Sequence, residues 1–312
     1  MEYRVLGKTN LEVSILSYGA SPLGGFYGDM DEKKQIDSVH YAIRSGINFI
    51  DTSPYYGLTQ SEIILGKALE VIPRDKFIMG TKVGRYGKDN FNFSYNRTIE
   101  SVNESLKRMR LDYLDIVQVH DIEFSDLNQV VTETLPALIK LKNQGIIKHI
   151  GVTGLPLKSI DLLVDSNISP EIECILSYCH HSLNDNSLTS IIPKLKERNI
   201  GVINASFLSM GMLTERGPPD WHPASPAIKQ KCLEAAEYCK QHGGNISKLA
   251  LQYTLLNPDI QTHLVGMPCI ENVKENLQTL TEPIDEILLQ TVLDILSPIH
   301  NQTWPSGKFE NN

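Results

Sequence analysis

Four polar residues stand where their types and spacing could move a proton and a hydride. Asp51, Lys82 and His120 each close a short apolar run, and Tyr56 follows Asp51 within the string DTSPYYG. The ordinary pKa of a tyrosine, about 10, is too high for ready proton exchange near pH 7, but a neighbouring ammonium favours the phenolate and lowers it. Asp51 would keep Lys82 charged, and His120 would hydrogen-bond a substrate oxygen. The set indicates proton transfer beside a carbonyl or alcohol, as hydride transfer requires.

Each of these residues also has a structural interpretation when taken alone. An Asp–Lys pair in a barrel mouth is often only structural, and a single histidine at a strand end is more often a satisfied core residue. Buried charges are costly unless they are paired, so Asp51 and Lys82 are expected to pair. The occurrence of four such residues together at three consecutive strand ends favours a chemical role over a structural one.

The elements that must position these residues are strands and helices in regular alternation. Segments with helical spacing separate eight apolar runs, which cover residues 15–20, 47–51, 77–82, 114–120, 148–153, 173–178, 201–205 and 262–266. The runs are rich in β-branched residues and do not alternate, as expected for strands covered by helices on both faces. Eight such units predict an α/β fold of the (β/α)8 TIM-barrel type. The alternative, an open doubly wound sheet, lacks its glycine fingerprint in SYGASPLGGFYG.

The whole chain, residues 1–312, is expected to form a single barrel domain with additions at both ends. Residues 1–14 read as an N-terminal β-hairpin that could plug the bottom of the barrel. Residues 208–226 form a long Gly/Pro-rich loop, and residues 298–312 form a C-terminal tail over the barrel mouth. Both are long rim loops at the end where barrel active sites lie.

Composition and charge exclude several classes of partner. The 29 Lys and Arg residues against 37 Asp and Glu residues give a formal net charge of −8, which disfavours nucleic acid and anionic membranes as partners. No apolar stretch is long enough to span a membrane, and the N-terminus has no secretory signal. The five cysteines form no C-x-x-C pair, so we expect reduced thiols and a cytoplasmic protein. A zinc site is not expected, because His180 and His181 lack a second pair of ligands.

Several motifs in order along the chain resemble those of the aldo-keto reductase family. They are DTSPYYG, TK at 81–82, VH at 119–120, GVTG at 151–154 and SKLALQY at 247–253, together with LGKTNLEVS near the front and LVGMPCIENVKENL near the back. The resemblance implies a barrel that binds a nicotinamide dinucleotide without a Rossmann domain. It implies that Tyr56 is the proton donor and acceptor, that Lys82 and Asp51 assist it, and that His120 positions the substrate.

Other strings are similar to a plant-type subgroup of this family that oxidises L-galactose. They include HDIEF, VTGLPL, ILSYCHHSLND, GPPDWHPASP and TWPSG, and the last two lie in the expected rim loops. This resemblance implies that a free L-sugar is oxidised at C1 to a lactone, for ascorbate synthesis or sugar breakdown. The residues expected to contact the sugar are Tyr56, His120, Asp121, Trp221 and Trp304.

The resemblance also implies a cofactor site, and local charge favours NAD over NADP. A 2′-phosphate calls for Arg or Lys, yet the two positions that are basic in NADP-using members fall near Gly266 and Asn272. Lys274, the one cation nearby in sequence, is flanked by Glu271 and Glu275. The alternative is that Lys274 or a distant side chain supplies the charge. The expected cofactor-binding residues are Ala20, Ser21, Asp51, Thr153, Ser177 or Tyr178, Ser206, Leu208, Gly211, Gly266, Asn272, Glu275 and Asn276.

One departure from the family pattern concerns the nicotinamide ring. Many members carry an aromatic residue after the seventh barrel strand that stacks on this ring, and Ala205 stands there in this sequence. Either another ring, such as Phe207, stacks instead, or the cofactor is held more loosely.

Three other functions stay open at this point. The first is a broader aldose 1-dehydrogenase, since L-fucose and D-arabinose share the ring stereochemistry of L-galactose from C1 to C4. The second is an NADPH-dependent carbonyl reductase. The third is a non-catalytic barrel that binds nucleotide and reports redox state to a partner, against which the intact set of four polar residues weighs.

Overall fold

Eight parallel strands close into a barrel in the computed structural model, which describes residues 1–25 and 31–312. Residues 26–28, the end of the glycine-rich segment noted above, lie outside the described part. The barrel order is β10-β3-β4-β5-β6-β7-β8-β9, and every neighbouring pair is parallel. The strands are β3 (Leu16–Gly19), β4 (Phe49–Asp51), β5 (Ile78–Val83), β6 (Leu114–Val119), β7 (Ile147–Gly154), β8 (Cys174–Tyr178), β9 (Gly201–Ala205) and β10 (Thr262–Gly266). The predicted barrel and its eight apolar runs are confirmed.

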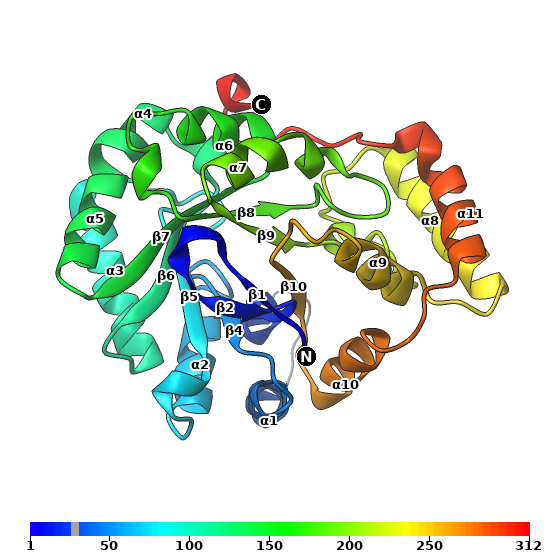
Figure 1. The fold of residues 1–312 in the computed structure, drawn as a ribbon, viewed down its shortest axis with the longest axis horizontal. Coiled ribbons are helices and arrows are strands. Elements are labelled where there is room, and N and C mark those ends of the chain that lie inside the picture. Colours follow the sequence, from blue (N-terminus) through cyan, green and yellow to red (C-terminus); the bar gives the residue numbers. More distant parts are fainter. Residues whose placement is uncertain (26–30) are drawn as a thin grey trace.

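Helices form a ring outside the barrel (Figure 1). They are α1 (Glu32–Arg44), α2 (Gln60–Leu69), α3 (Tyr95–Met109), α4 (Leu127–Gln129), α5 (Leu135–Asn143), α6 (Leu157–Val164), α7 (Ile192–Glu197), α8 (Pro226–Gln241), α9 (Ile246–Leu255), α10 (Ile270–Thr279) and α11 (Glu286–Leu296). Their apolar sides pack on outward-facing strand residues such as Ile50, Val117 and Ile175. A right-twisted parallel sheet covered in this way buries both faces of each strand.

A two-stranded hairpin closes one end of the barrel. Strands β1 (Tyr3–Val5) and β2 (Glu12–Ser14) pair antiparallel, as predicted. Leu6 and Val13 are fully buried and pack with Phe49, Ile116 and other inward-facing strand residues. The hairpin therefore fills the N-terminal end of the barrel and leaves the carboxyl ends of the strands as the open mouth.

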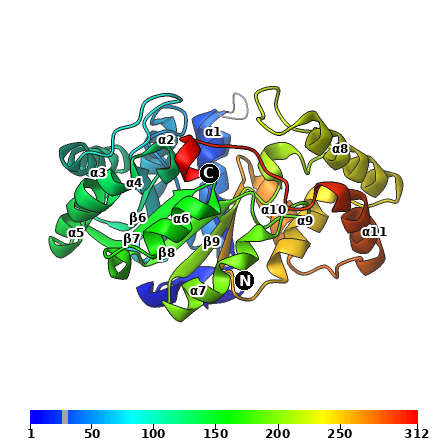
Figure 2. The ribbon, with the colours of Figure 1, turned by 90° about the horizontal axis from the view of Figure 1, so that it is seen from above.

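The C-terminal tail lies at the opposite end from the hairpin (Figure 2). The backbone N–H of Asn301 donates to the carbonyl of Asn184 in the loop after β8, at 3.0 Å. Trp304 packs edge-on against His222 in the loop after β9, with 4.9 Å between ring centroids. Lys308 donates its backbone N–H to the carbonyl of Glu123 in the loop after β6. The tail thus crosses the loops that leave three different strands.

Candidate active site

Strand alternation places three polar side chains inside the barrel, above its apolar core. Asp51 shares a face with Phe49, and Gln118 shares a face with Ile116, because residues two apart on a strand point the same way. Lys82 likewise follows Ile78 on the inner face of β5. These side chains lie near the carboxyl ends of the strands, where barrel enzymes place their chemistry.

Lys82 is the centre of a buried polar network. Its ammonium forms an ion pair with Asp51, donates to the carbonyl of Thr52 at 2.8 Å and donates to the hydroxyl of Tyr56 at 3.3 Å. Gln118 donates to the other carboxylate oxygen of Asp51 at 2.7 Å. Asp51 and Lys82 are almost completely buried, so their pairing is what makes both charges tolerable there.

Tyr56 is held by a tight loop after β4. Its backbone N–H donates to the carbonyl of Ser53 at 3.0 Å. Gly57 adopts a φ of +59°, and a Cβ there would overlap the backbone of Gly24, so only glycine permits this close approach. Gly24 ends the short 3-10 helix that follows β3. The loops after β3 and β4 therefore pack backbone to backbone and fix the tyrosine beside Lys82.

His120 completes the group. Its backbone N–H donates to the carbonyl of Val83 at 2.8 Å, and its ring meets the Tyr56 ring edge-on with 5.8 Å between centroids. Its Nδ1 lies 2.9 Å from Ser53 Oγ, which already accepts from the backbone N–H of Tyr55. The Ser53 hydroxyl is then free to donate to Nδ1, which leaves the proton of a neutral imidazole on Nε2. An Nε2–H is a donor suited to a substrate oxygen.

The pKa of Tyr56 is not lowered as the charge of Lys82 alone would predict. Burial raises the pKa of the Tyr56 hydroxyl, and the Lys82 ammonium opposes this without reversing it. The expected net lowering is therefore wrong for the protein alone, because removal from water outweighs one charge. The pKa of Lys82 is raised: Asp51 and Tyr56 outweigh the effect of its own burial. Burial also raises the pKa of Asp51, against the opposing effects of Lys82 and Gln118. Lys82 is therefore charged and lies beside the neutral phenol of Tyr56.

Burial lowers the pKa of His120 to about 3; Asp121 opposes this, while Lys82 and Arg85 add to it. We therefore expect its ring to stay neutral from pH 8 to pH 5. Because the unfolded chain binds a proton near pH 6.5 and the folded chain does not, this group removes stability as the pH falls below about 6.5. An NMR titration of ring-labelled histidine, assigned with a His120→Gln variant, measures this directly. A His120 signal that moves with a midpoint near pH 6.5 would contradict a ring that stays neutral down to pH 5.

The residues expected to contact sugar lie in different surroundings. Asp121 is buried next to His120, adopts a φ of +51°, and forms an ion pair with Arg85. Trp304 is buried in the tail, whereas Trp221 in the loop after β9 is half exposed. The structure thus brings Asp121 and His120 together and places Trp304 against His222.

Three polar residues of this site were not anticipated from the sequence. Gln118 and Ser53 hold Asp51 and His120, and Arg85 holds Asp121 while its guanidinium lies 4.0 Å above the ring of Tyr55. Gln118 has a sequence signal, since it stands two residues before His120 and must share its face. Arg85 follows the end of β5 and has the weaker signal of a cation in a strand-end loop.

Buried polar atoms without partners test whether a nicotinamide fits at the mouth. Among the described residues, Thr153 Oγ1 and Gln118 Oε1 are buried and have no hydrogen-bond partner. Thr153 pairs with Leu176 and so shares its inner face. Such orphaned groups are costly unless a ligand satisfies them, so they fit the carboxamide of a nicotinamide. Ser177 Oγ is also buried without a partner among the described residues, but it lies on the outer face with Ile175. Of the pair named above, Tyr178 is the residue on the inner face.

The remaining residues expected at the cofactor lie in the loops after β3, β9 and β10. Ala20 is buried and donates its N–H to the carbonyl of Asp51, and Ser21 begins the following 3-10 helix. Ser206, Leu208 and Gly211 lie in the loop after β9. Phe207 is buried in the outer core, so it does not present a ring to stack at the mouth in place of Ala205.

The segment after β10 carries the residues expected near the adenosine. Gly266 ends β10, and Asn272, Glu275 and Asn276 lie on α10. Asn272 Oδ1 accepts from the Cys269 thiol at 3.0 Å, and Asn276 donates to the Asn272 carbonyl at 2.8 Å.

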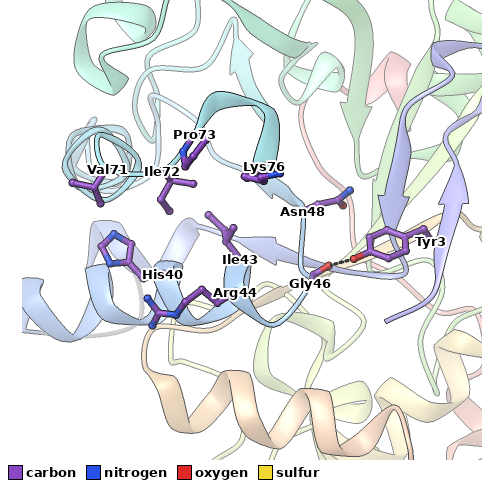
Figure 3. A pocket seen from close by; sticks show the side chains of 10 residues that line it. All are labelled: Tyr3, His40, Ile43, Arg44, Gly46, Asn48, Val71, Ile72, Pro73 and Lys76. Atoms are coloured by element: carbon purple, nitrogen blue, oxygen red, sulfur yellow. Dashed lines mark hydrogen bonds between the residues drawn. The ribbon is translucent and has the colours of Figure 1, made fainter.

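A separate cavity of about 510 Å³ lies at the other end of the barrel (Figure 3). Its lining includes Gly46 and Asn48 before β4 and Lys76 before β5, and Tyr3 closes one side by donating to the carbonyl of Gly46 at 2.9 Å. It is far from Tyr56 in the fold, and catalysis in barrels occurs at the opposite face. The described residues hold no cluster that could bind a metal ion, and no helix among them could cross a membrane.

Comparisons with known proteins agree with the barrel fold. The sequence model of the Aldo/keto reductase family matches residues 15–295. The chain is 49% identical to L-galactose dehydrogenase of Arabidopsis thaliana over 100% of its own length and 99% of the relative. It is 33% identical to D-arabinose 1-dehydrogenase of Saccharomyces cerevisiae, over 95% and 94% of the two chains. The solved holo form of an aldo-keto reductase from Bacillus halodurans superimposes with a TM-score of 0.78 at 26% identity, covering 95% of this chain and 96% of that one.

Proposed function

Because the chain belongs to the aldo/keto reductase family, we propose that it oxidises the C1 hydroxyl of free L-galactose to the lactone, with NAD as the hydride acceptor. The observation that carries this proposal is the contact of Tyr56 with Lys82 inside the barrel mouth, beside Asp51 and His120. The similarity to a plant L-galactose dehydrogenase along the whole chain supports the choice of sugar.

Each residue has a defined task in this proposal. Tyr56 Oη takes the proton of the C1 hydroxyl, and the Lys82 ammonium, 3.3 Å away, stabilises the phenolate that must do so. Asp51 keeps Lys82 in place, and His120 Nε2–H donates to the sugar oxygen. Bound NAD would supply the electrophilic ring that accepts the hydride from C1. Since burial raises the pKa of Tyr56, the rate of oxidation should rise with pH.

Thr153 and Tyr178 are the residues that would hold the nicotinamide end, and Asn272, Glu275 and Asn276 would lie toward the adenosine. The preference for NAD rests on local charge. Lys274 lies over the ring of Tyr41 on α1, 5.6 Å from its centroid. Hydrogen bonds from its own backbone N–H and from Cys269 lower the pKa of Glu271, and Lys274 and Lys34 add smaller contributions. These cations are therefore accompanied by a carboxylate that would repel a 2′-phosphate.

Replacing Asn272 with Arg tests the charge argument. A guanidinium at the start of α10 should raise kcat/KM with NADP by about 10-fold, the value of one favourable charge contact. Asn272→Gln is the matched control and should not change the cofactor preference. Initial rates with NAD and NADP measure the effect. An unchanged ratio in Asn272→Arg would show that this side chain does not face the ribose.

A second candidate is a broader aldose 1-dehydrogenase. The similarity to a D-arabinose 1-dehydrogenase favours it, because D-arabinose and L-fucose match L-galactose from C1 to C4. A site that reads only those ring positions would admit all three sugars.

A panel of aldoses separates these functions. The purified protein is incubated with L-galactose, L-fucose or D-arabinose and either NAD or NADP, and the absorbance of reduced cofactor is followed. The proposal predicts the highest kcat/KM for L-galactose with NAD. Similar values for all three sugars would favour the broader activity, and no turnover with any aldose would rule out both. Faster turnover with NADP would overturn the cofactor assignment.

The compartment proposed for this activity is the cytoplasm. The five cysteines are free, and four of them are buried, which suits a reducing environment. The net negative charge argues against nucleic acid as a partner.

A further inference from the structure

Glu123 is a fully buried carboxyl group to which the mechanism above assigns no task. It lies in the short 3-10 helix after β6, directly after the segment that carries His120 and Asp121. Its Oε1 accepts from Ser306 Oγ at 2.9 Å, from the Tyr178 hydroxyl at 3.3 Å and from the backbone N–H of Leu155 at 3.3 Å. One carboxyl oxygen therefore joins the loops after β6 and β7, the end of β8 and the C-terminal tail.

The backbone around Glu123 also holds the tail. Its carbonyl accepts from the N–H of Lys308 and from the side chain of Asn311, each at 2.9 Å. Gly307 adopts a φ of +73°, and a Cβ at this position would overlap the Glu123 backbone. A Cβ at Gly154 would lie 2.8 Å from Glu123 Oε2. Glycines thus allow the tail and the loop after β7 to close directly onto this residue.

The surroundings of Glu123 favour its neutral form. Its Oε2 is buried and has no partner among the described residues, so an ionised oxygen there would lack solvation. Burial raises the pKa of Glu123 to about 8, and Asp121 adds to the rise; hydrogen bonds from Ser306 and from backbone N–H groups oppose it without reversing it. The titratable groups that face it are Asp121, whose charge Arg85 balances, and the hydroxyl of Tyr178. No cation forms an ion pair with it within the described ranges.

We propose that Glu123 is a positioning residue for the sugar site: as a neutral acid it holds the C-terminal tail across the barrel mouth, and its ionisation releases the tail. The tail carries Trp304, whose ring packs on His222 in the loop after β9. The tail packs directly on Glu123 through Ser306 and Gly307, so hydration of an ionised carboxylate requires the tail to lift away, and this would withdraw Trp304 from the mouth. The part of this inference that concerns sugar affinity rests on the proposed function, and the part that concerns release of the tail does not.

Tail release can be measured without substrate. The chain has two tryptophans, so a Trp221→Phe background leaves Trp304 as the only one. Trp304 is buried, and its emission should move to longer wavelength when the tail leaves the mouth. We expect this shift between pH 6.5 and 9.5 with a midpoint near 8, and no shift when Glu123→Gln is added. Glu310→Gln, which removes an exposed carboxyl group of the tail, is the matched control and should keep the shift.

Emission that stays constant over this pH range, or a shift that persists in Glu123→Gln, would overturn the proposal. This result does not depend on which reaction the protein catalyses, so it is distinguishable from a failure of the sugar-oxidation assignment.

Kinetics supply the second arm once turnover with L-galactose is established. KM for the sugar should rise above pH 8 in the wild type and stay flat in Glu123→Gln, with kcat unaffected by the substitution. Asn311→Ala leaves Glu123 intact but removes a tail contact, and should raise KM at pH 7 by about 10-fold, as expected for one or two lost hydrogen bonds. A KM unchanged in Asn311→Ala, or the same alkaline rise in Glu123→Gln, would contradict the role of the tail.

Stability provides a readout of the protonation state of Glu123 that does not depend on turnover. A raised acid pKa means that the folded state keeps a proton that the unfolded state loses, so wild-type stability falls as pH rises from about 4.3 to 8. Glu123→Gln should therefore raise Tm at pH 8 and leave it unchanged at pH 4.5. An equal change in Tm at both pH values would oppose a neutral Glu123.

Discussion

Tyr56→Phe should lower kcat by about 10³-fold or more, because the substitution removes the hydroxyl oxygen that lies beside the Lys82 ammonium and would take the C1 proton. The ring remains, so its edge-on contact with His120 and the packing of the loop should persist. Steady-state rates with L-galactose measure the loss. Titration of intrinsic fluorescence with NAD should give a Kd within about twofold of the wild type, since the phenol contributes little to holding the dinucleotide.

Tyr238→Phe is the control for the loss of one tyrosine hydroxyl. Tyr238 lies on α8 and stacks on His242, away from the mouth, so its turnover should match the wild type. A Tyr56→Phe enzyme that keeps more than a tenth of the wild-type kcat would mean that another group carries the proton. A large loss of NAD affinity would mean instead that the tyrosine organises the binding site.

Lys82→Met should have the largest effect on stability. Among the described residues it leaves the buried Asp51 carboxylate with Gln118 as its one side-chain partner, and breaking a buried ion pair in this way costs about 3–5 kcal/mol. Chemical denaturation at pH 7.5 measures the change in the free energy of unfolding. Activity should also fall to background, because the phenolate of Tyr56 loses its stabilising charge.

The double substitution Asp51→Asn with Lys82→Met separates the two roles of the pair. Removing both charges eliminates the unpaired carboxylate, so most of the lost stability should return while activity does not. A double variant as unstable as Lys82→Met would show that packing, rather than charge, determines the cost. Activity that returned with stability would contradict a catalytic task for Lys82.

The barrel and the central group of side chains could be predicted because their signals are local. Each strand is a short β-branched run, and Asp51, Lys82 and His120 end three such runs. The ends of parallel strands meet at one edge, so sequence order alone brings these residues together. Tyr56 could be added because a short loop after β4 cannot carry it far.

The rest of the site depends on contacts between segments distant in sequence. Arg85 reaches Asp121 across two loops, and Glu123 meets Ser306 after a separation of 183 residues. The pKa of Tyr56 depends on burial, which the charge of Lys82 alone does not reveal. The inward choice of Tyr178 over Ser177 follows from strand register, which a single sequence specifies only to within a residue or two.

The central claim is that C1 of L-galactose reaches a nicotinamide beside Tyr56. L-galactose labelled with deuterium at C1 tests it directly, by mass spectrometry of the reduced cofactor after incubation with the enzyme and NAD. The account predicts one deuterium in each reduced cofactor molecule formed, and about 10³-fold or more less labelled cofactor per unit time with Tyr56→Phe. Reduced cofactor without deuterium, or as much labelled cofactor from the Tyr56→Phe variant as from the wild type, would contradict it.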